Sequence, residues 1–317
     1  GTSALVSNTT ASNNTAVGYV AGYSTTTGAL NTFVGREAAY SNTTGQHNVA
    51  IGQSANYANT TGNYNVSLGS QALRFNTTSS NNVAVGYQTL YSMSSTGDAN
   101  KSTAVGYQAG YTSTHNVDAF GSQALYSNTT GIFSVAIGRE ALYSNTTASS
   151  NTAVGYQALY DNTTGTGNNA LGYQALTNNT TANYNTAFGH VALFTNVTGT
   201  ANTAVGSQVL YNCTGGGNTV LGSTAGYAVT SGSNNLLLGL DTGRTGSPGG
   251  NITSGSNIIV LGDENITSAQ IKVDWTVVSD QRDKTDFTPL DLGLDFVNAL
   301  APVTYKWDMR SKYGDKS

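Results

Sequence analysis

The chain has 317 residues with a formal net charge of −4; only 9% are charged, while 38 are glycine and 19 are tyrosine. No basic run is present, which argues against nucleic acid or an anionic membrane surface as a partner. One cysteine, Cys213, excludes an internal disulfide framework and a cysteine zinc cluster, and no apolar stretch reaches the roughly 18 residues of a membrane span. We therefore expect no membrane insertion.

One motif repeats through residues 1–262 and predicts a repetitive rod. Its marker is a glycine after a short apolar stretch, and most of these glycines follow one another at the same interval. A period of about 17 residues has no room for a helical hairpin, so the natural unit is one coil of an all-β, parallel β-solenoid. The marker glycines are Gly18, Gly35, Gly52, Gly69, Gly86, Gly106, Gly121, Gly138, Gly155, Gly172, Gly189, Gly206, Gly222, Gly239 and Gly262.

The residues before each marker glycine predict a strand with two apolar faces. The residue directly before the glycine is apolar in all fifteen copies, and the residue two before it is alanine in ten. Neighbouring residues of a strand point to opposite faces. We expect the large residues to fill the coil and the alanine column to pack against other chains, which predicts a homotrimer.

The segment after the glycine predicts the rest of the coil. It carries alanine, then leucine, then tyrosine in ten copies, which suggests a second, outer strand with tyrosine toward solvent. The "SNTTG" stretch has the residue types of a turn, with asparagine and glycine at positive φ. Asparagine stands four residues before the glycine in eleven of fifteen copies and should stack into an amide ladder at the coil corner.

The repeats resemble the β-roll heads of trimeric adhesins. Residues 134–138 read "SVAIG" and residues 48–52 read "NVAIG", which is the short strand that recurs in those coils. The resemblance implies a trimeric β-roll used for surface attachment. The coils of that family are typically shorter than the repeat of this chain, so each coil here needs a longer outer arm.

The chain changes character after residue 240, where nineteen of its 28 charged residues lie. "NIIVLG" at 257–262 reads as a final coil, and residues 263–278 predict a connecting strand. Thr288 and Pro289 then have the residue types that begin a helix, and "VTYKW" at 303–307 returns as a strand. The pattern predicts the start of a small α+β domain at residues 279–317.

This C-terminal segment resembles the intramolecular chaperone domain, a self-cleaving peptidase, that ends many phage tail spikes and tail fibres. The blocks that carry the resemblance are "SDQRDK" at 279–284 and "GLDFVNALAPVTYKW" at 293–307, with Asp283 in place of the usual leucine. The resemblance implies autocleavage of the bond from Val278 to Ser279, with Ser279 as nucleophile and Lys284 as its base. It implies no external substrate.

Other candidate sites are weaker. An exposed tyrosine ring can stack on a sugar, so Tyr126, Tyr143 and Tyr160 are glycan-binding candidates, although the same column could be a packing layer. The acids and the three histidines of the repeats are scattered, which predicts no glycosidase pair, no metal site and no cofactor. The Asn-Thr-Thr sequences match the glycosylation pattern, but their turn propensity explains them.

Together these patterns predict a segment of a phage tail fibre. It would be a trimeric rod that attaches the virion to a host-surface glycan or envelope receptor and that matures by cleavage before Ser279. The alternative is an adhesin on a bacterial cell surface. An ice-binding protein is a third reading, which the position of many threonines in turns disfavours.

Overall fold

The computed structural model describes residues 1–94 and 101–270. The chain divides into two compact units, residues 1–267 and 268–317. The first unit holds fifteen short strands and, over its described residues, no helix. The strands are β1 (Thr15–Val17), β2 (Thr32–Val34), β3 (Val49–Ile51), β4 (Val66–Leu68), β5 (Val83–Val85), β6 (Thr103–Val105), β7 (Val117–Phe120), β8 (Ser134–Ile137), β9 (Thr152–Val154), β10 (Asn169–Leu171), β11 (Thr186–Phe188), β12 (Thr203–Val205), β13 (Thr219–Leu221), β14 (Leu236–Leu238) and β15 (Ile259–Leu261).

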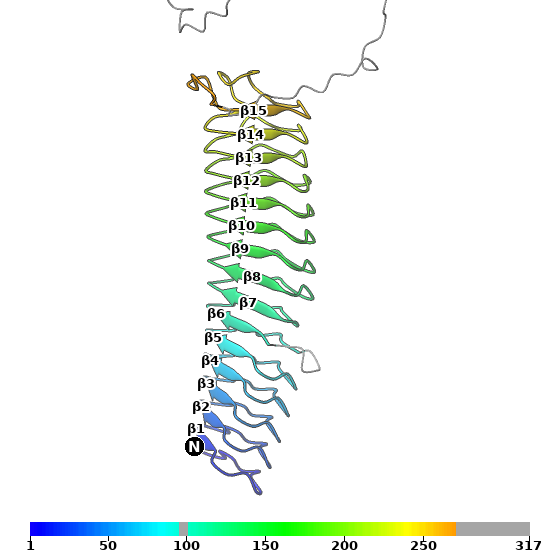
Figure 1. The fold of residues 1–317 in the computed structure, drawn as a ribbon. Helices are drawn as coiled ribbons and strands as arrows, with labels where there is room; N and C mark the ends of the chain where they lie inside the picture. Colours follow the sequence, from blue (N-terminus) through cyan, green and yellow to red (C-terminus); the bar gives the residue numbers. More distant parts are fainter. Residues whose placement is uncertain (95–100, 271–317) are drawn as a thin grey trace, which may run out of the picture. The chain divides into compact units, whose positions relative to one another are not determined.

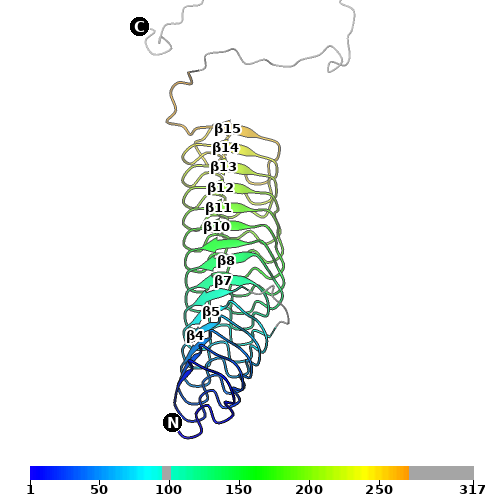
Figure 2. The same cartoon turned by 60° about the horizontal axis from the view of Figure 1, so that its bottom comes forward.

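All fifteen strands belong to one parallel sheet whose order follows the chain. Each strand pairs with the strand of the next coil, so that Thr15 lies opposite Thr32, and Thr32 opposite Val49. Figure 1 shows the strands stacked in one column, and Figure 2, with the N-terminal end turned forward, shows each coil closing behind its strand. The predicted parallel β-solenoid is thereby confirmed, and so is the predicted length of its coils.

The rest of each coil is a run of turns, and the expected second strand is absent from the described residues. The second and fourth residues after the marker glycine have positive φ, for example 52° at Gln157 and 53° at Leu159. Their N–H groups still bond between coils. Gln157 donates to the carbonyl of Arg139 at 3.0 Å, in the preceding coil, and Leu159 donates to that of Ala175 at 3.0 Å, in the following coil. Positive φ is uncommon for such residues, which is why the sequence did not predict it.

The marker glycine is required by the backbone. Gly155 has a φ of 136°, in a region that side chains rarely tolerate, and a Cβ there would overlap the carbonyl of Gly172 in the next coil. The same close approach recurs from coil to coil along the glycine column. The glycine therefore ends each strand and lets successive backbones come into contact.

The coil interior is lined by the small strand residue, and the predicted assignment of the two faces was wrong. Ala84 and Ala136 are fully buried within the single chain, whereas Leu171 and Leu221, which directly precede marker glycines, are 50% and 53% exposed. The opposite wall already carries a column of large residues, so the interior has room only for alanine on the strand side. The fully buried leucines of that wall are Leu73, Leu90, Leu125, Leu142, Leu159, Leu176, Leu193 and Leu210.

Exceptions to this packing compensate one another. β2 places Phe33 at the alanine position, fully buried, and the leucine position of the preceding coil is Gly22. A Cβ on Gly22 would lie 2.7 Å from Cδ2 of Phe33. Near the other end, Leu237 replaces the alanine, and a Cβ on Gly226 would lie 3.2 Å from its Cδ1. At these two places the interior thus keeps one large and one small group facing each other.

The predicted asparagine ladder at the coil corner is confirmed. The backbone N–H of Asn48 donates to Oδ1 of Asn31 at 2.8 Å, and Nδ2 of Asn48 donates to the carbonyl of Gly62 at 2.8 Å. The side chain of Asn48 therefore bonds 14 and 17 residues further along the chain, to Gly62 and to the N–H of Asn65, and so links its coil to the next. Because these amides are buried, each bond removes a polar group that would otherwise lack a partner.

The asparagines of the Asn-Thr-Thr sequences form a second ladder, which the sequence analysis did not predict. Nδ2 of Asn162 donates to Oδ1 of Asn145 at 3.0 Å and to the carbonyl of Gly165 at 3.0 Å. Asn145 and Asn162 are fully buried. Their amides are enclosed in the coil, so these side chains are not accessible to a glycosyltransferase in the folded protein.

Candidate functional site

The outer face of the sheet carries a valine, isoleucine, leucine or phenylalanine in every coil. We define the outer face as the side chains three residues and one residue before each marker glycine, at thirty positions in total. Parallel sheets seldom leave one face to water, and soluble monomers rarely expose a continuous apolar patch of this length. The outer face is therefore a candidate contact surface. Its most exposed apolar members are Val17, Leu68, Phe120, Ile137, Leu171, Phe188, Leu221, Ile259 and Leu261.

One charged residue interrupts the outer face. Asp118 of β7 is exposed and is the only charged residue at the thirty positions. It lines a hollow of about 240 Å³ together with Lys101, Phe133 and Val135. The ion pairs found among the described residues do not include one between Lys101 and Asp118. The irregular coils near Lys101 thus place two opposite charges, unpaired with each other, at the edge of an apolar strip.

The tyrosine column forms continuous stacks of rings. The centroid of Tyr143 lies 5.1 Å from that of Tyr126 and 5.1 Å from that of Tyr160, with interplanar angles of 4° and 8°. Burial raises the pKa of Tyr143 and Tyr160. The rings are half-buried, and their faces cover one another. A glycan that meets these three residues would therefore contact ring edges and hydroxyl groups.

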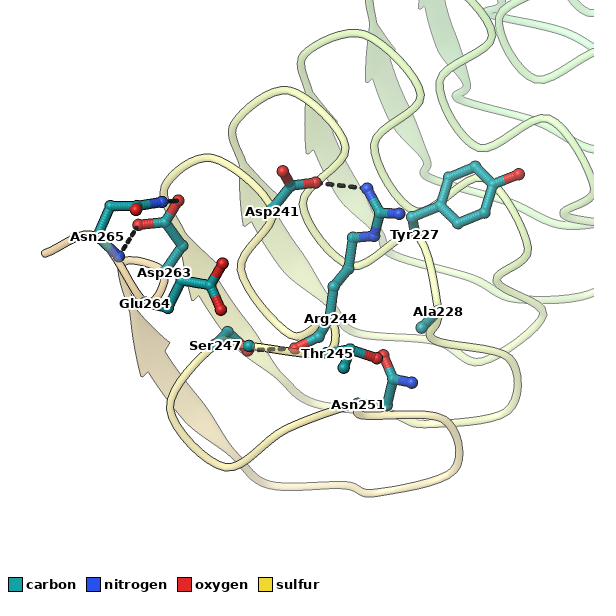
Figure 3. A pocket seen from close by; sticks show the side chains of 11 residues that line it. Tyr227, Ala228, Asp241, Arg244, Thr245, Ser247, Asn251, Asp263, Glu264 and Asn265 are labelled. Carbon is teal, nitrogen blue, oxygen red and sulfur yellow. Dashed lines mark hydrogen bonds and ion pairs between the residues drawn. The ribbon is translucent and has the colours of Figure 1, made fainter.

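The last coil carries a polar cavity of about 380 Å³. It arises where the interval from Gly239 to Gly262 is longer than the usual interval between marker glycines. Figure 3 shows the guanidinium group of Arg244 between Asp241, with which it forms an ion pair, and the ring of Tyr227. The guanidinium carbon of Arg244 lies 5.3 Å from the ring centre of Tyr227. This contact continues the tyrosine column into the cavity.

The side chains that line this cavity carry charges and hydrogen-bonding groups. A hydrogen bond from the Thr224 hydroxyl, at 2.6 Å, and then the Arg244 guanidinium lower the pKa of Asp241. Asp263 accepts from the side chain of Asn265 at 3.1 Å. Figure 3 also shows Glu264 on the cavity wall. Acceptors and one cation around an open hollow suit a polyhydroxylated ligand, such as a sugar.

Cys213 occupies the position of the second asparagine ladder in its coil and is fully buried. Its Sγ lies 3.5 Å from the carbonyl of Gly215 and 3.5 Å from Nδ2 of Asn218. Burial raises the pKa of the thiol to about 11. A thiol that stays protonated at neutral pH is a poor nucleophile and a poor metal ligand, so Cys213 is a structural residue.

The predicted autocleavage residues Val278, Ser279 and Lys284 lie outside the described residues, as do the predicted helix and strands after residue 270. Within the described parts of the chain, no group of three or more His, Cys, Asp or Glu side chains could hold a metal ion. The same parts contain no helix long and apolar enough to cross a bilayer.

Comparison with known families bears on the C-terminal segment. Residues 279–317 match the family described as chaperone of endosialidase. The match confirms the resemblance of this segment to an intramolecular chaperone, and a β-solenoid followed by such a segment fits a protein of the tail-fibre or tail-spike type. None of the curated proteins matches the chain.

Proposed function

We propose that this chain is a segment of a phage tail fibre or tail spike, a trimeric rod that attaches the virion to its host. The observation that carries the proposal is the chaperone match at residues 279–317 behind a solenoid that ends near residue 262. That arrangement favours a fibre over an adhesin on a bacterial cell surface. The chaperone segment would assist assembly and then leave, so that the assembled rod could not easily unfold and refold.

Maturation would break the peptide bond between Val278 and Ser279. Lys284, as a neutral amine, would accept the proton of the Ser279 hydroxyl while Oγ attacks the carbonyl carbon of Val278. The amide nitrogen of Ser279 leaves with a proton, and an ester then links Val278 to Oγ. Hydrolysis of this ester by water releases one fragment that ends at Val278 and one that begins at Ser279.

Mass spectrometry of the purified full chain tests this maturation. We expect the two fragments for the wild type and intact chain for Ser279→Ala and Lys284→Met. Thr285→Ala removes a neighbouring hydroxyl and should leave cleavage unchanged. Cleavage at the same bond in the Ser279→Ala variant would show that Ser279 is not the nucleophile.

Host attachment would use a glycan or another envelope component. Two surfaces support this part of the proposal: the stacked column with Tyr126, Tyr143 and Tyr160, and the cavity around Arg244. Binding of the full chain to a panel of immobilised bacterial O-polysaccharides tests it. Loss of binding in Tyr143→Leu would assign the column, and loss in Arg244→Gln would assign the cavity. Absence of binding to every polysaccharide would leave a purely structural rod as the better account.

The ice-binding alternative finds some support in the strands. Threonine stands at the first outer-face position in seven of fifteen coils, for example at Thr15 and Thr203. Leucine and phenylalanine at neighbouring positions make that face uneven, and Asp118 interrupts it. A thermal-hysteresis measurement on the full chain separates the two functions, because a tail-fibre rod should show no hysteresis.

A further inference from the structure

The outer face needs a partner, and its geometry restricts the partner to a narrow class. Fifteen strands at about 4.8 Å each give a strip roughly 70 Å long and, at a width of about 10 Å, roughly 700 Å² in area. A stable protein interface buries about 800 Å² per partner. Partners that together follow the strip from β1 to β15 therefore bury about the area of one standard interface per chain, whereas a partner that covers a few coils does not.

A second copy of the chain fits this strip better than an unrelated protein. The ridges of the outer face follow the coil spacing, with interruptions at the short coil before β7 and the long coil before β15. An identical chain that lies parallel to the first has the same spacing and the same interruptions at the same heights. The rows of outer-face side chains on the two copies then have the same spacing and can pack against each other from β1 to β15.

A repetitive strip leaves the axial position of the copies poorly defined. A shift by one coil returns nearly the same apolar contacts, because every coil presents a valine, isoleucine, leucine or phenylalanine before its glycine. Repetitive interfaces of this kind are held in register by a polar or charged residue at one position. On the outer face Asp118 is the only charged residue; the other polar members are threonines and Asn169.

We propose that identical copies of the chain cover the outer face in parallel register, and that Asp118 of one copy pairs with Lys101 of its neighbour to set that register. The proposal rests on the trimeric fibre proposed above and assigns its interface. Thr103 and Asp118 are partners in adjacent strands, so Lys101 and Asp118 lie about one coil apart along the axis. A lysine side chain spans that step. A shift of several coils in either direction would separate the two charges.

The first experiment asks whether the outer face is covered. Hydroxyl-radical footprinting of the full chain, with the oligomeric state measured by sedimentation velocity, should find trimers in which Leu171 and Phe188 are modified several-fold less than Phe75 and Val197. All four side chains are between 39% and 50% exposed in the single chain. Equal modification, in a trimer or in a monomer, overturns the proposal.

The second experiment separates folding from association. Leu171→Glu with Leu221→Glu places charges on the outer face without touching the coil interior, so the far-UV circular dichroism should be retained. We expect loss of footprint protection, and monomers if the solenoid alone holds the copies together. Phe75→Glu with Val197→Glu is the matched control on other faces of the coil and should leave protection and assembly unchanged. Retained protection in the outer-face variant contradicts the proposed interface.

The third experiment tests the register pair. Asp118→Lys should raise the concentration at which the oligomer dissociates by about tenfold or more, and adding Lys101→Asp should restore much of the loss. The same three variants are then made in the monomeric Leu171→Glu, Leu221→Glu background. Thermal unfolding of these monomers should show no coupling energy between Asp118 and Lys101. Coupling in that monomer would assign the pair to a contact within one copy and remove its role in register.

Failure of this interface and failure of the proposed function give different results. A chain that cleaves at Val278 but leaves its outer face open is a tail-fibre protein with a different interface. A chain with a protected outer face that never cleaves has the interface but lacks the proposed maturation.

Discussion

At the scale of single residues, Cys213 provides a direct test of how tightly a coil is closed. The thiol is fully buried, and burial raises its pKa to about 11. At pH 8 the native protein should therefore not react with iodoacetamide over hours, and one equivalent should react after denaturation. Peptide mass spectrometry reads the modification, and Thr147→Cys, at an exposed site, serves as the control that reacts at once. Rapid reaction of native Cys213 would show that this coil opens.

Asn56 is a second residue whose environment predicts a measurable effect. It is fully buried at the leucine position of its coil, and neither side-chain amide atom has a hydrogen-bond partner in the structure. Its φ of 51° matches the 52° of Leu73 in the next coil, so leucine fits this backbone. Asn56→Leu should raise the free energy of unfolding by about 1–3 kcal/mol.

Chemical denaturation at fixed protein concentration measures this change. Asn56→Ala removes the same unpaired groups without filling the space, so it should give a smaller gain than leucine. A loss of stability in Asn56→Leu would indicate that an ordered water satisfies the asparagine.

At the scale of the coil, the paired exceptions Phe33 and Gly22 predict a compensating double mutant. Phe33→Ala should lower the free energy of unfolding by about 3–5 kcal/mol because it leaves a cavity. Gly22→Leu alone should lower it by about 1–3 kcal/mol, since the new side chain meets the Phe33 ring. The double variant restores the usual alanine and leucine pair and should be more stable than Phe33→Ala.

Thermal or urea unfolding of the four proteins at one concentration gives the coupling energy. Gly22 has a φ of 61°, close to the 50° of Leu5 at the same place in the preceding coil, so backbone strain does not obscure the result. Strictly additive effects of the two substitutions would show that the residues do not share one interior space.

The coil also shows which features the sequence can predict. The strand position, the parallel order and the asparagine ladder follow from the repeat, because each is fixed by spacing and by local hydrogen bonding. The direction of the two strand faces does not follow, since both are apolar. Two exceptions in the sequence indicate which face points into the coil. Phe33 occurs with Gly22, and Leu237 occurs with Gly226. Such compensation of a large residue by glycine is expected only between residues that face each other inside a coil.

The candidate sites also differ in whether the sequence alone can predict them. Ser279 and Lys284 are predicted from a local pattern in the segment that matches the chaperone family, and their role stays a prediction. The cavity around Arg244 is lined by residues 227–228, 241, 244–247, 251 and 263–265, which belong to successive coils. No local pattern marks such a site, although the lengthened last coil and its charges mark the region where it lies.

At the scale of the whole molecule, each coil contacts mainly its two neighbours, because strand pairing, ladders and ring stacks all join adjacent coils. Stability in such an array is close to a sum over coils and their interfaces. Removal of residues 156–172 deletes one complete coil and joins Gly155 to Tyr173, which keeps every column in place. We expect this variant to unfold in the same cooperative transition, within a few degrees of the wild-type Tm.

A deletion that removes only part of one coil should behave differently. Removal of residues 156–163 takes less than half of a coil but leaves the ladder position after Asn145 and the interior position after Leu142 without their next members. The segments on either side then lose the contact through which each stabilises the other, and calorimetry at matched concentration should resolve two transitions in place of one. The larger deletion is thus expected to be the milder one. This order follows only if the single coil is the unit of stability, and the reverse order would show that stability resides in longer cooperative blocks.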